Sequence, residues 1–162
     1  LLQRKIPIAP EDTGGSLHDK LAPIAAELMV EALEGLAQGT LTPIPQDEGL
    51  ATYAPLLKKS DGKLEFTQDA ETLARRVRAF DPWPGTFAAI KGEQVKITRA
   101  KAEPGGKAEA PGRVVRASSE GIVIACGRGR LWALELQPAG RRRMSAAEFL
   151  AGRRVLAGDV FE

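Results

Sequence analysis

The stretch that decides the fold is TFAAIKGEQVKITRAKAEPGGKAEAPGRVVRASSEGIVIACGRGRLWALEL, residues 86–136. Apolar and polar residues alternate in it with a period of two, which is typical of half-buried strands. The turn signals between the apolar runs are Lys91-Gly92, Pro104-Gly105-Gly106, Glu120-Gly121 and Gly127–Gly129. The predicted strands are Thr86–Ile90, Val95–Ala102, Gly112–Ala117, Ile122–Cys126 and Arg130–Leu136. Short strands with glycine-rich turns indicate a small closed or partly closed barrel, of which the OB fold is a common type.

Upstream of these strands the period changes to that of a helix. Lys63–Phe66 alternates and predicts a short strand. Thr67 or Asp69 can cap the helix that follows, and Pro82 and Pro84 end it. Its apolar face consists of Ala70, Leu73, Ala74, Val77 and Phe80. Downstream, Ser145-Ala146-Ala147-Glu148 is a capping box that predicts a last short helix through Leu150.

The N-terminal part of the chain reads as a strand and a long helix. Residues 1–8 predict a short strand, which Pro7 and Pro10 would end because proline donates no ladder hydrogen bond. Ser16 is placed to cap a helix over about residues 17–37, with Asp19 returning a bond to the Ser16 backbone. Apolar residues recur there at helical spacing.

Two features interrupt this pattern. Pro23 lies inside the predicted helix, where a missing hydrogen bond should produce a kink or a restart. Between Thr40 and Gly62, three prolines and two glycines with little periodicity predict a linker that wraps over the surface.

Composition and charge narrow the classes of function. The chain has 43% hydrophobic and 27% charged residues, which is typical of a globular protein. It has no apolar run long enough to span a bilayer and no signal-peptide pattern, so we expect a cytoplasmic protein without a membrane partner. One Cys and one His exclude a Cys/His metal site of the usual kind. The first residue is Leu1 rather than Met, which we interpret as a fragment of a longer protein.

The charges are unevenly distributed along the chain. Residues 1–54 carry three basic and eight acidic side chains, whereas residues 55–162 carry 20 basic and 13 acidic ones. This asymmetry suggests two units and a polyanionic partner for the second. The alternative is an uneven solvated surface with no partner.

Several segments together resemble the methionyl-tRNA formyltransferase family, in order and spacing, across essentially the whole chain. These are Pro7–Thr13, Ser16–Leu21, Pro45–Asp47, Thr52–Ala54, Arg78–Gly85, Leu136–Gly140 and Arg143–Ser145. The Arg78–Gly85 run, Arg-Ala-Phe-Asp-Pro-Trp-Pro-Gly, and the Gln-Pro-Ala-Gly run that ends at Gly140 are the most specific of them.

The resemblance implies a function for the parent protein. The family transfers a formyl group from 10-formyltetrahydrofolate to the amino group of initiator methionyl-tRNA in translation initiation, and its catalytic Asn, His and Asp lie in an N-terminal Rossmann-like domain. None of these three has a match here, so we expect no catalytic, cofactor-binding or metal-binding residue in this chain and no activity from the chain alone. The missing N-terminal domain becomes an expected partner.

The resemblance also implies an α+β domain plan. Residues 1–40 would be the C-terminal end of the Rossmann-like α/β formyltransferase domain, and residues 41–62 a linker. Residues 63–162 would be an OB-like β-barrel with an added helix that binds tRNA.

Three basic clusters in the second half are candidates for tRNA binding, since Lys and Arg supply phosphate contacts. They are Lys58 and Lys59 on the linker, Arg75, Arg76 and Arg78 on the helix before the Pro-Trp-Pro turn, and Arg141, Arg142 and Arg143 in a loop before a helix. The alternative is that each cluster forms ion pairs within its own domain or a solvated surface.

Four other residues have competing roles. His18 is the only imidazole, but helix-end packing or hydrogen bonding is favoured over catalysis there. Cys126 is expected to be a small buried apolar residue. Trp83 and Trp132 could stack on bases, but core packing is the favoured role for both.

Two other functions remain as alternatives. One is the C-terminal part of a related formyltransferase that acts on a small molecule, such as an amino-sugar nucleotide, and the basic second half argues against it. The other is a stand-alone OB-type nucleic-acid-binding module, which the acidic N-terminal strand and helix argue against.

Overall fold

The strands predicted between residues 86 and 136 are all present in the computed structural model, which describes residues 1–105 and 109–162. They are β1 (Phe87–Ile90), β2 (Glu93–Glu103), β3 (Val114–Ser118), β4 (Gly121–Ala125) and β5 (Arg130–Pro138). A sixth, two-residue strand, β6 (Met144–Ser145), pairs with β5. Of the predicted turn Pro104-Gly105-Gly106, the last residue lies outside the described residues.

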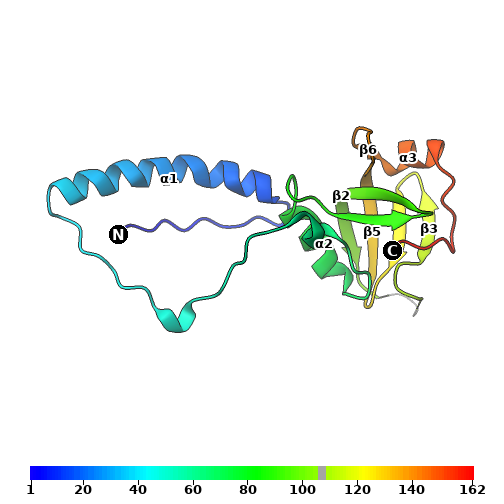
Figure 1. Ribbon diagram of the computed structural model, residues 1–162, viewed down its shortest axis with the longest axis horizontal. Coiled ribbons are helices and arrows are strands. Elements are labelled where there is room, and N and C mark those ends of the chain that lie inside the picture. Colours follow the sequence, from blue (N-terminus) through cyan, green and yellow to red (C-terminus); the bar gives the residue numbers. More distant parts are fainter. Residues whose placement is uncertain (106–108) are drawn as a thin grey trace. The chain divides into compact units, whose positions relative to one another are not determined.

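These strands form one antiparallel sheet in the order β1-β2-β5-β4-β3 (Figure 1). The long strand β2 changes register with β5 between Ile97 and Ala100, and such irregularities bend a strand. The C-terminal residues join the two edges. Ala89 of β1 exchanges two 2.8 Å hydrogen bonds with Glu162, and the Phe161 amide donates to the Gly112 carbonyl at 2.8 Å. The curled sheet is therefore closed through the end of the chain.

The inner face of the curled sheet holds the core. Its largest fully buried side chains are Phe149, Phe161, Leu64, Leu73, Ile97, Ile122, Ile124, Leu131 and Leu136. Phe66 and Phe161 contact each other with ring centroids 6.1 Å apart. Every buried residue of this core falls between Leu64 and Phe161. The barrel therefore has a hydrophobic core of its own.

Two helices cover the barrel. Helix α2 (Ala70–Ala79) is capped by Asp69, whose carboxylate accepts from the Thr72 amide at 2.9 Å, so Asp69 rather than Thr67 is the cap. Helix α3 (Ala146–Gly152) begins at the predicted capping box of Ser145 and Glu148. The residue at which each helix begins is set by its cap, because the cap side chain accepts from a backbone amide that has no partner inside the helix.

The predicted strand at Lys63–Phe66 is wrong. The segment makes a single bridge between Lys63 and Phe87, with the Leu64 amide donating to the Phe87 carbonyl at 2.9 Å. The chain turns directly afterwards, where the Gln68 amide donates to the Glu65 carbonyl at 3.0 Å. The alternation nevertheless predicted burial correctly, since Leu64 and Phe66 both belong to the core.

The chain divides into two compact units, Leu1–Leu56 and Leu57–Glu162, and the barrel makes up the second. The first unit contains helix α1 (Gly14–Ala37) and a short 3-10 helix, η1 (Glu48–Leu50). A second 3-10 helix, η2 (Lys59–Gly62), belongs to the barrel unit. Both 3-10 helices lie in the segment predicted as a linker.

The start of α1 differs from the prediction. Thr13 is the cap, and Ser16 is the third helical residue, whose hydroxyl returns a 3.0 Å bond to the Thr13 amide. Ser16 therefore takes the reciprocal role predicted for Asp19. The helix does not restart at Pro23, because α1 continues through this proline as one helix of 24 residues. One missing bond does not end a helix that many other bonds propagate.

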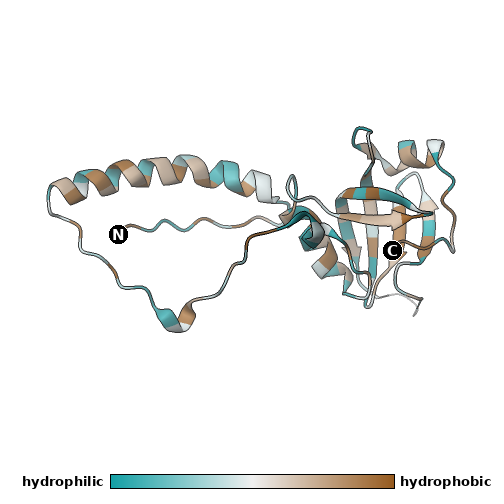
Figure 2. Ribbon diagram, in the orientation of Figure 1, coloured by the Kyte–Doolittle hydropathy of each residue, from teal (hydrophilic) through white to brown (hydrophobic). Residues whose placement is uncertain are grey.

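The strand predicted for residues 1–8 is also wrong. A strand needs a neighbouring ladder partner, and the described chain offers none to this segment. None of residues 1–56, all of which the structure describes, is buried. Apolar residues recur along α1, as the brown bands of Figure 2 show. Several of their side chains are exposed. The most exposed are Met29, Val30, Leu33 and Leu36.

Candidate nucleic-acid interface

Helix α2 carries three of the eight predicted basic residues, and its packing decides how they reach solvent. Leu73 and Val77 are fully buried in the core. Residues on other faces of a helix point away from such a buried stripe. Arg75 is accordingly exposed, while Arg76 and Arg78, at the flanks of the stripe, are half-buried.

Arg75 and Arg76 are engaged in different ways. A guanidinium nitrogen of Arg75 lies 3.7 Å from a Glu71 carboxylate oxygen, and both side chains are largely exposed, so the pair contributes little to stability. Arg76 donates to the backbone carbonyl of Asp61 at 2.7 Å and lies 5.2 Å from the centroid of the Phe80 ring. In the described part of the chain no carboxylate pairs with Arg76, so its charge is held in place without being neutralised.

Arg142 is paired with the cap of α3. Its guanidinium donates to the Glu148 carboxylate at 2.6 Å. The backbone amide and hydroxyl of Ser145 donate to the same carboxylate. The hydrogen bond from the Ser145 backbone amide is the largest cause that lowers the pKa of Glu148 from 4.5 to about 2, and the hydrogen bond from Arg142 is the next largest. Arg142 therefore supports the start of the helix.

The two neighbours of Arg142, Arg141 and Arg143, differ from each other in whether a carboxylate pairs with them. Arg143 forms an ion pair with Asp81, 62 residues away in the sequence. Arg141 is exposed, and its backbone is engaged on both sides: its amide donates to the Pro138 carbonyl at 3.1 Å, and its carbonyl accepts from the Gln137 side chain at 2.8 Å. Among the residues that the structure describes, no carboxylate pairs with Arg141.

The contacts bring the three predicted clusters to adjoining elements. Lys58 and Lys59 lie at the start of η2, and the bond from Arg76 to the Asp61 carbonyl joins η2 to α2. The pair of Arg143 with Asp81 joins the loop after β5 to the end of α2. The structure thus connects all three clusters within the barrel unit. Within the described residues, the candidates without a carboxylate partner are Lys58, Lys59, Arg76, Arg78 and Arg141.

The core packing predicted for Trp83 is wrong. Its side chain is 54% exposed in the turn that follows α2. The turn reverses tightly, with the Gly85 amide donating to the Phe80 carbonyl at 2.8 Å, and Pro84 takes the buried position beside it. A side chain as large as indole finds no room inward at the tip of so short a turn. Trp132 is 8% exposed, but it lies outside the barrel core.

One basic residue beside this turn was missed in the sequence. Lys96 on β2 lines a hollow of about 200 Å³ with Gln94, Gln137 and Pro138–Gly140. A methyl group added at Gly85 would lie 3.9 Å from the Lys96 ammonium, so Lys96 reaches the Trp83 turn. The alternation of Val95–Ala102 already placed Lys96 on the solvent face and could have revealed it.

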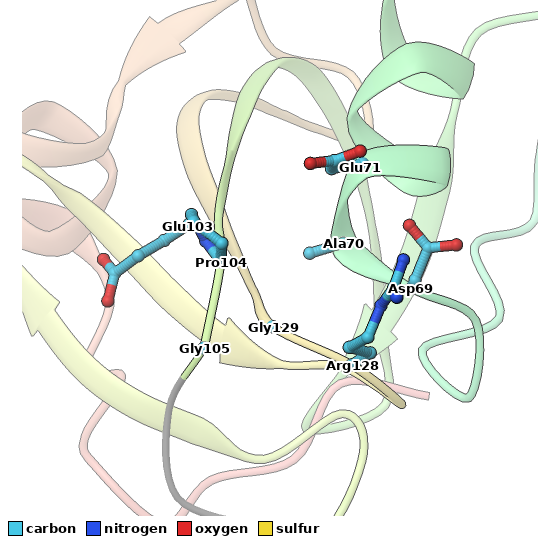
Figure 3. Close-up of a pocket in the computed structure, with 8 residues that line it drawn as sticks. All are labelled: Asp69, Ala70, Glu71, Glu103, Pro104, Gly105, Arg128 and Gly129. Atoms are coloured by element: carbon cyan, nitrogen blue, oxygen red, sulfur yellow. The ribbon is translucent and has the colours of Figure 1, made fainter.

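A second hollow, of about 270 Å³, lies between the start of α2 and the end of β2 (Figure 3). Asp69 and Arg128 lie close together on its wall, and Glu71 and Glu103 are also part of the lining. Hydrogen bonds from Thr72 lower the pKa of Asp69, which is occupied as the cap of α2. This mixture of acid and base, with one carboxylate used for the fold, does not resemble an anion site or a catalytic pair.

His18 and Cys126 do not form a reactive centre. His18 is exposed on α1, and Cys126 is buried in the other unit. Burial raises the pKa of the Cys126 thiol from 9.0 to about 11, as befits a small apolar core residue. Residues 1–105 and 109–162 contain no group of three or more His, Cys, Asp or Glu that could hold a metal ion. No helix in the described chain has the length and apolar character needed to cross a membrane.

Comparisons with known proteins agree with this architecture. The chain is 50% identical over 159 residues to the methionyl-tRNA formyltransferase of Thiobacillus denitrificans, covering 98% of this chain and 51% of the relative. It is 42% identical over 159 residues to that of Myxococcus xanthus, covering 98% of this chain and 50% of the relative. The chain thus spans about half the length of the curated relatives it matches.

Solved structures show the same fold. The crystal structure of HypX from Aquifex aeolicus in complex with tetrahydrofolic acid matches with a TM-score of 0.65 and 21% identity, over 98% of this chain and 30% of that one. A variant of the same HypX matches with a TM-score of 0.63 and 24% identity, over 91% of this chain and 27% of that one. Residues 56–154, which hold most of the barrel and both of its helices, match the formyl transferase C-terminal domain. The chain therefore belongs to the family of the formyl transferase C-terminal domain.

Proposed function

We propose that this chain is the C-terminal, tRNA-holding part of a cytoplasmic methionyl-tRNA formyltransferase. The parent enzyme would transfer the formyl group of 10-formyltetrahydrofolate to the amino group of initiator methionyl-tRNA. The names of the relatives and the family match support the reaction class. The observation that carries the tRNA role is the joining of three basic clusters on η2, α2 and the loop after β5.

The chemistry belongs to a part of the enzyme outside this chain. Attack of an amine on a formyl carbon produces an oxyanion, which needs fixed hydrogen-bond donors, and the ammonium must lose protons to a positioned base. His18 is exposed and Cys126 is held as a neutral thiol, and they lie in different units. We therefore propose that the chain alone is inactive and that it acts by orienting the acceptor.

Residues 1–40 would complete the Rossmann-like catalytic domain. The apolar side chains exposed along α1 support this, because a stripe of that size is normally covered. Residues 41–62 would act as the linker and residues 63–162 as an OB-like tRNA-binding barrel. The parent enzyme would need no metal.

Binding of tRNA by the chain at increasing salt tests the proposal. Phosphate contacts make the logarithm of the binding constant fall linearly with the logarithm of salt concentration, by about 0.7–0.9 for each contact. We expect Arg78→Gln and Arg141→Gln each to weaken binding and to reduce the magnitude of this slope by about 0.7–0.9, the value of one phosphate contact. Fluorescence anisotropy with labelled initiator tRNA measures both quantities.

Arg142→Gln is the matched control for Arg141→Gln. It removes the same charge from the next residue, but this charge is already paired with Glu148 at 2.6 Å. We expect a smaller change in slope. Binding that is undetectable or insensitive to salt would contradict the tRNA role. An enzyme carrying this chain that formylates an amino-sugar nucleotide, but not methionyl-tRNA, would contradict the proposed acceptor.

A further inference from the structure

Two cations lie over one tryptophan on the outer face of the barrel. Lys101 of β2 is the direct partner of Trp132 on β5. On the other side, Trp132 pairs with Val123 of β4, and Val123 pairs with Arg116 of β3. The Lys101 ammonium and the Arg116 guanidinium each lie 4.7 Å from the centroid of the Trp132 ring. The two charges are thus no further apart than twice that distance.

The position of Trp132 is fixed by its buried neighbours on β5 and by a hydrogen bond to β2. Its neighbours Leu131 and Ala133 are fully buried in the core, so the alternation of β5 turns Trp132 outward. Its indole N–H donates to the Glu103 carboxylate at 2.6 Å. The ring is only 8% exposed because the two cationic side chains cover it, while both of those side chains are themselves exposed.

An aromatic ring holds a cation without bringing an opposite charge to it, whereas a carboxylate cancels the charge of the cation that it pairs with. Two other cations of this face, Arg99 and Arg130, are of the second kind. Arg99 lies 2.8 Å from Glu135, and Arg130 lies 2.8 Å from Glu109. Within the described residues no carboxylate pairs with Lys101 or Arg116. The ring therefore orders these two charges without neutralising them.

We propose that Lys101 and Arg116, ordered on Trp132, form a cradle for the phosphodiester backbone of the bound RNA. The inference rests on the proposed function and extends it to an RNA contact away from the three predicted clusters. Lys96 and Lys101 both lie on β2, on the solvent side of the sheet. At about 3.3 Å per residue, they mark a track of roughly 16 Å from the Trp83 turn to the cradle.

The shape of the site favours an RNA backbone over a small anion. The cradle lies on the outer, convex face of a curled sheet, which a polyanion can cross but which does not enclose a small ligand. Both cations are also ordered before binding, which reduces the entropy that a phosphate contact has to overcome. Arg116 adds a planar donor group suited to phosphate oxygens.

The test compares the salt dependence of tRNA binding by the whole chain in a double variant and a matched control. Lys101→Gln with Arg116→Gln removes both cradle charges, and we expect the slope to decrease by about 1.4–1.8, the value of two contacts. The control is Arg99→Gln on the same strand, whose charge is already paired with Glu135. Thermal unfolding establishes that each variant is folded. An unchanged slope in the double variant, or an equal decrease in the control, overturns the cradle.

Tryptophan fluorescence gives a direct second readout. The chain has two tryptophans, so Trp132 is the only one left in a Trp83→Phe background. We expect tRNA to change the emission of Trp132 in this background, and the two Gln substitutions to abolish the change. No response to tRNA, or the same response to inorganic phosphate alone, overturns an RNA-backbone site.

These outcomes separate the cradle from the proposed function. If the unaltered chain shows no salt-dependent tRNA binding, both are wrong. If Arg78→Gln and Arg141→Gln weaken binding while the double variant does not, only the cradle is wrong.

Discussion

Single residues in this chain owe their properties to a few short contacts. Glu148 accepts from the amide and the hydroxyl of Ser145 and from Arg142, and it is ionised to an unusually low pH as a result. Cys126 shows the opposite effect, since burial keeps its thiol protonated. Neither shift points to catalysis. Each is the consequence of a structural role, a helix cap in one case and a core position in the other.

The Glu148 cap should make stability depend on pH in acid. Its folded pKa of about 2 lies below the ordinary 4.5, so its contribution is complete above about pH 4.5 and is lost as the pH falls through about 2. We expect the difference in unfolding free energy between the parent chain and Glu148→Gln to shrink over this range. Urea unfolding at several pH values measures it. A difference that stays constant from pH 6 to pH 2 would show that the carboxylate charge does not support the cap.

Cys126 should react slowly in the native chain. A pKa raised from 9.0 to about 11 leaves a thiolate fraction about 100-fold lower at pH 8, and burial restricts access further. We expect iodoacetamide to alkylate native Cys126 at least about 100-fold more slowly than the same residue in denaturant. Mass spectrometry of timed samples gives both rates. Equal rates would mean that the native thiol is accessible and that its pKa is not raised.

At the scale of elements, the closure of the barrel depends on the end of the chain. The Gly112 carbonyl accepts a hydrogen bond from the Phe161 amide, and the Gly112 φ of 83° lies in the left-handed region. A methyl group there would lie 2.3 Å from the Phe161 carbonyl oxygen. Gly112 is therefore required both for its backbone conformation and for the close approach of the C-terminal segment around Phe161.

Gly112→Ala should open this closure. We expect it to destabilise the chain by about 3 kcal/mol or more, from left-handed strain plus the clash with the C-terminal segment. Gly92→Ala is the control, since Gly92 has a φ of 78° but nothing within 4 Å of an added methyl. It should cost only the strain, about 1–2 kcal/mol. Chemical denaturation compares the two, and an equal loss would show that the contact with Phe161 does not close the barrel.

At the scale of the whole molecule, the two units differ in how they are stabilised. The barrel unit, Leu57–Glu162, contains every buried residue of the hydrophobic core. In the first unit the ion pairs of Arg4 with Glu27 and Glu31 are exposed, and no residue is buried. Exposed ion pairs contribute at most about 1 kcal/mol each, so the first unit has little to stabilise it by itself.

The barrel unit should therefore fold independently. We expect residues 57–162 expressed alone to unfold cooperatively at nearly the same temperature as the whole chain. Residues 1–56 alone should show no cooperative transition. Calorimetry and circular dichroism of the two pieces test this. Loss of the transition from the 57–162 piece would mean that the first unit stabilises the barrel.

The sequence by itself determined the strands of the barrel, the cap at Ser145 and the family, and it limited the cap of α2 to Thr67 or Asp69. These depend on periodicity and on contacts a few residues apart, which a single segment already contains. The strand predicted at Lys63–Phe66 and the cap predicted at Ser16 show the limit of such reasoning. A strand also needs a partner ladder, and two residues three apart can exchange roles in a capping box.

Only the tertiary structure decided which charges are neutralised and which face solvent. Arg143 meets Asp81 across 62 residues, and Arg116 reaches Trp132 across an intervening strand. The exposure of Trp83 and the closure through Phe161 depend equally on segments distant in sequence. Neutralisation and burial are set by the distance between side chains, and for residues this far apart the fold alone fixes that distance.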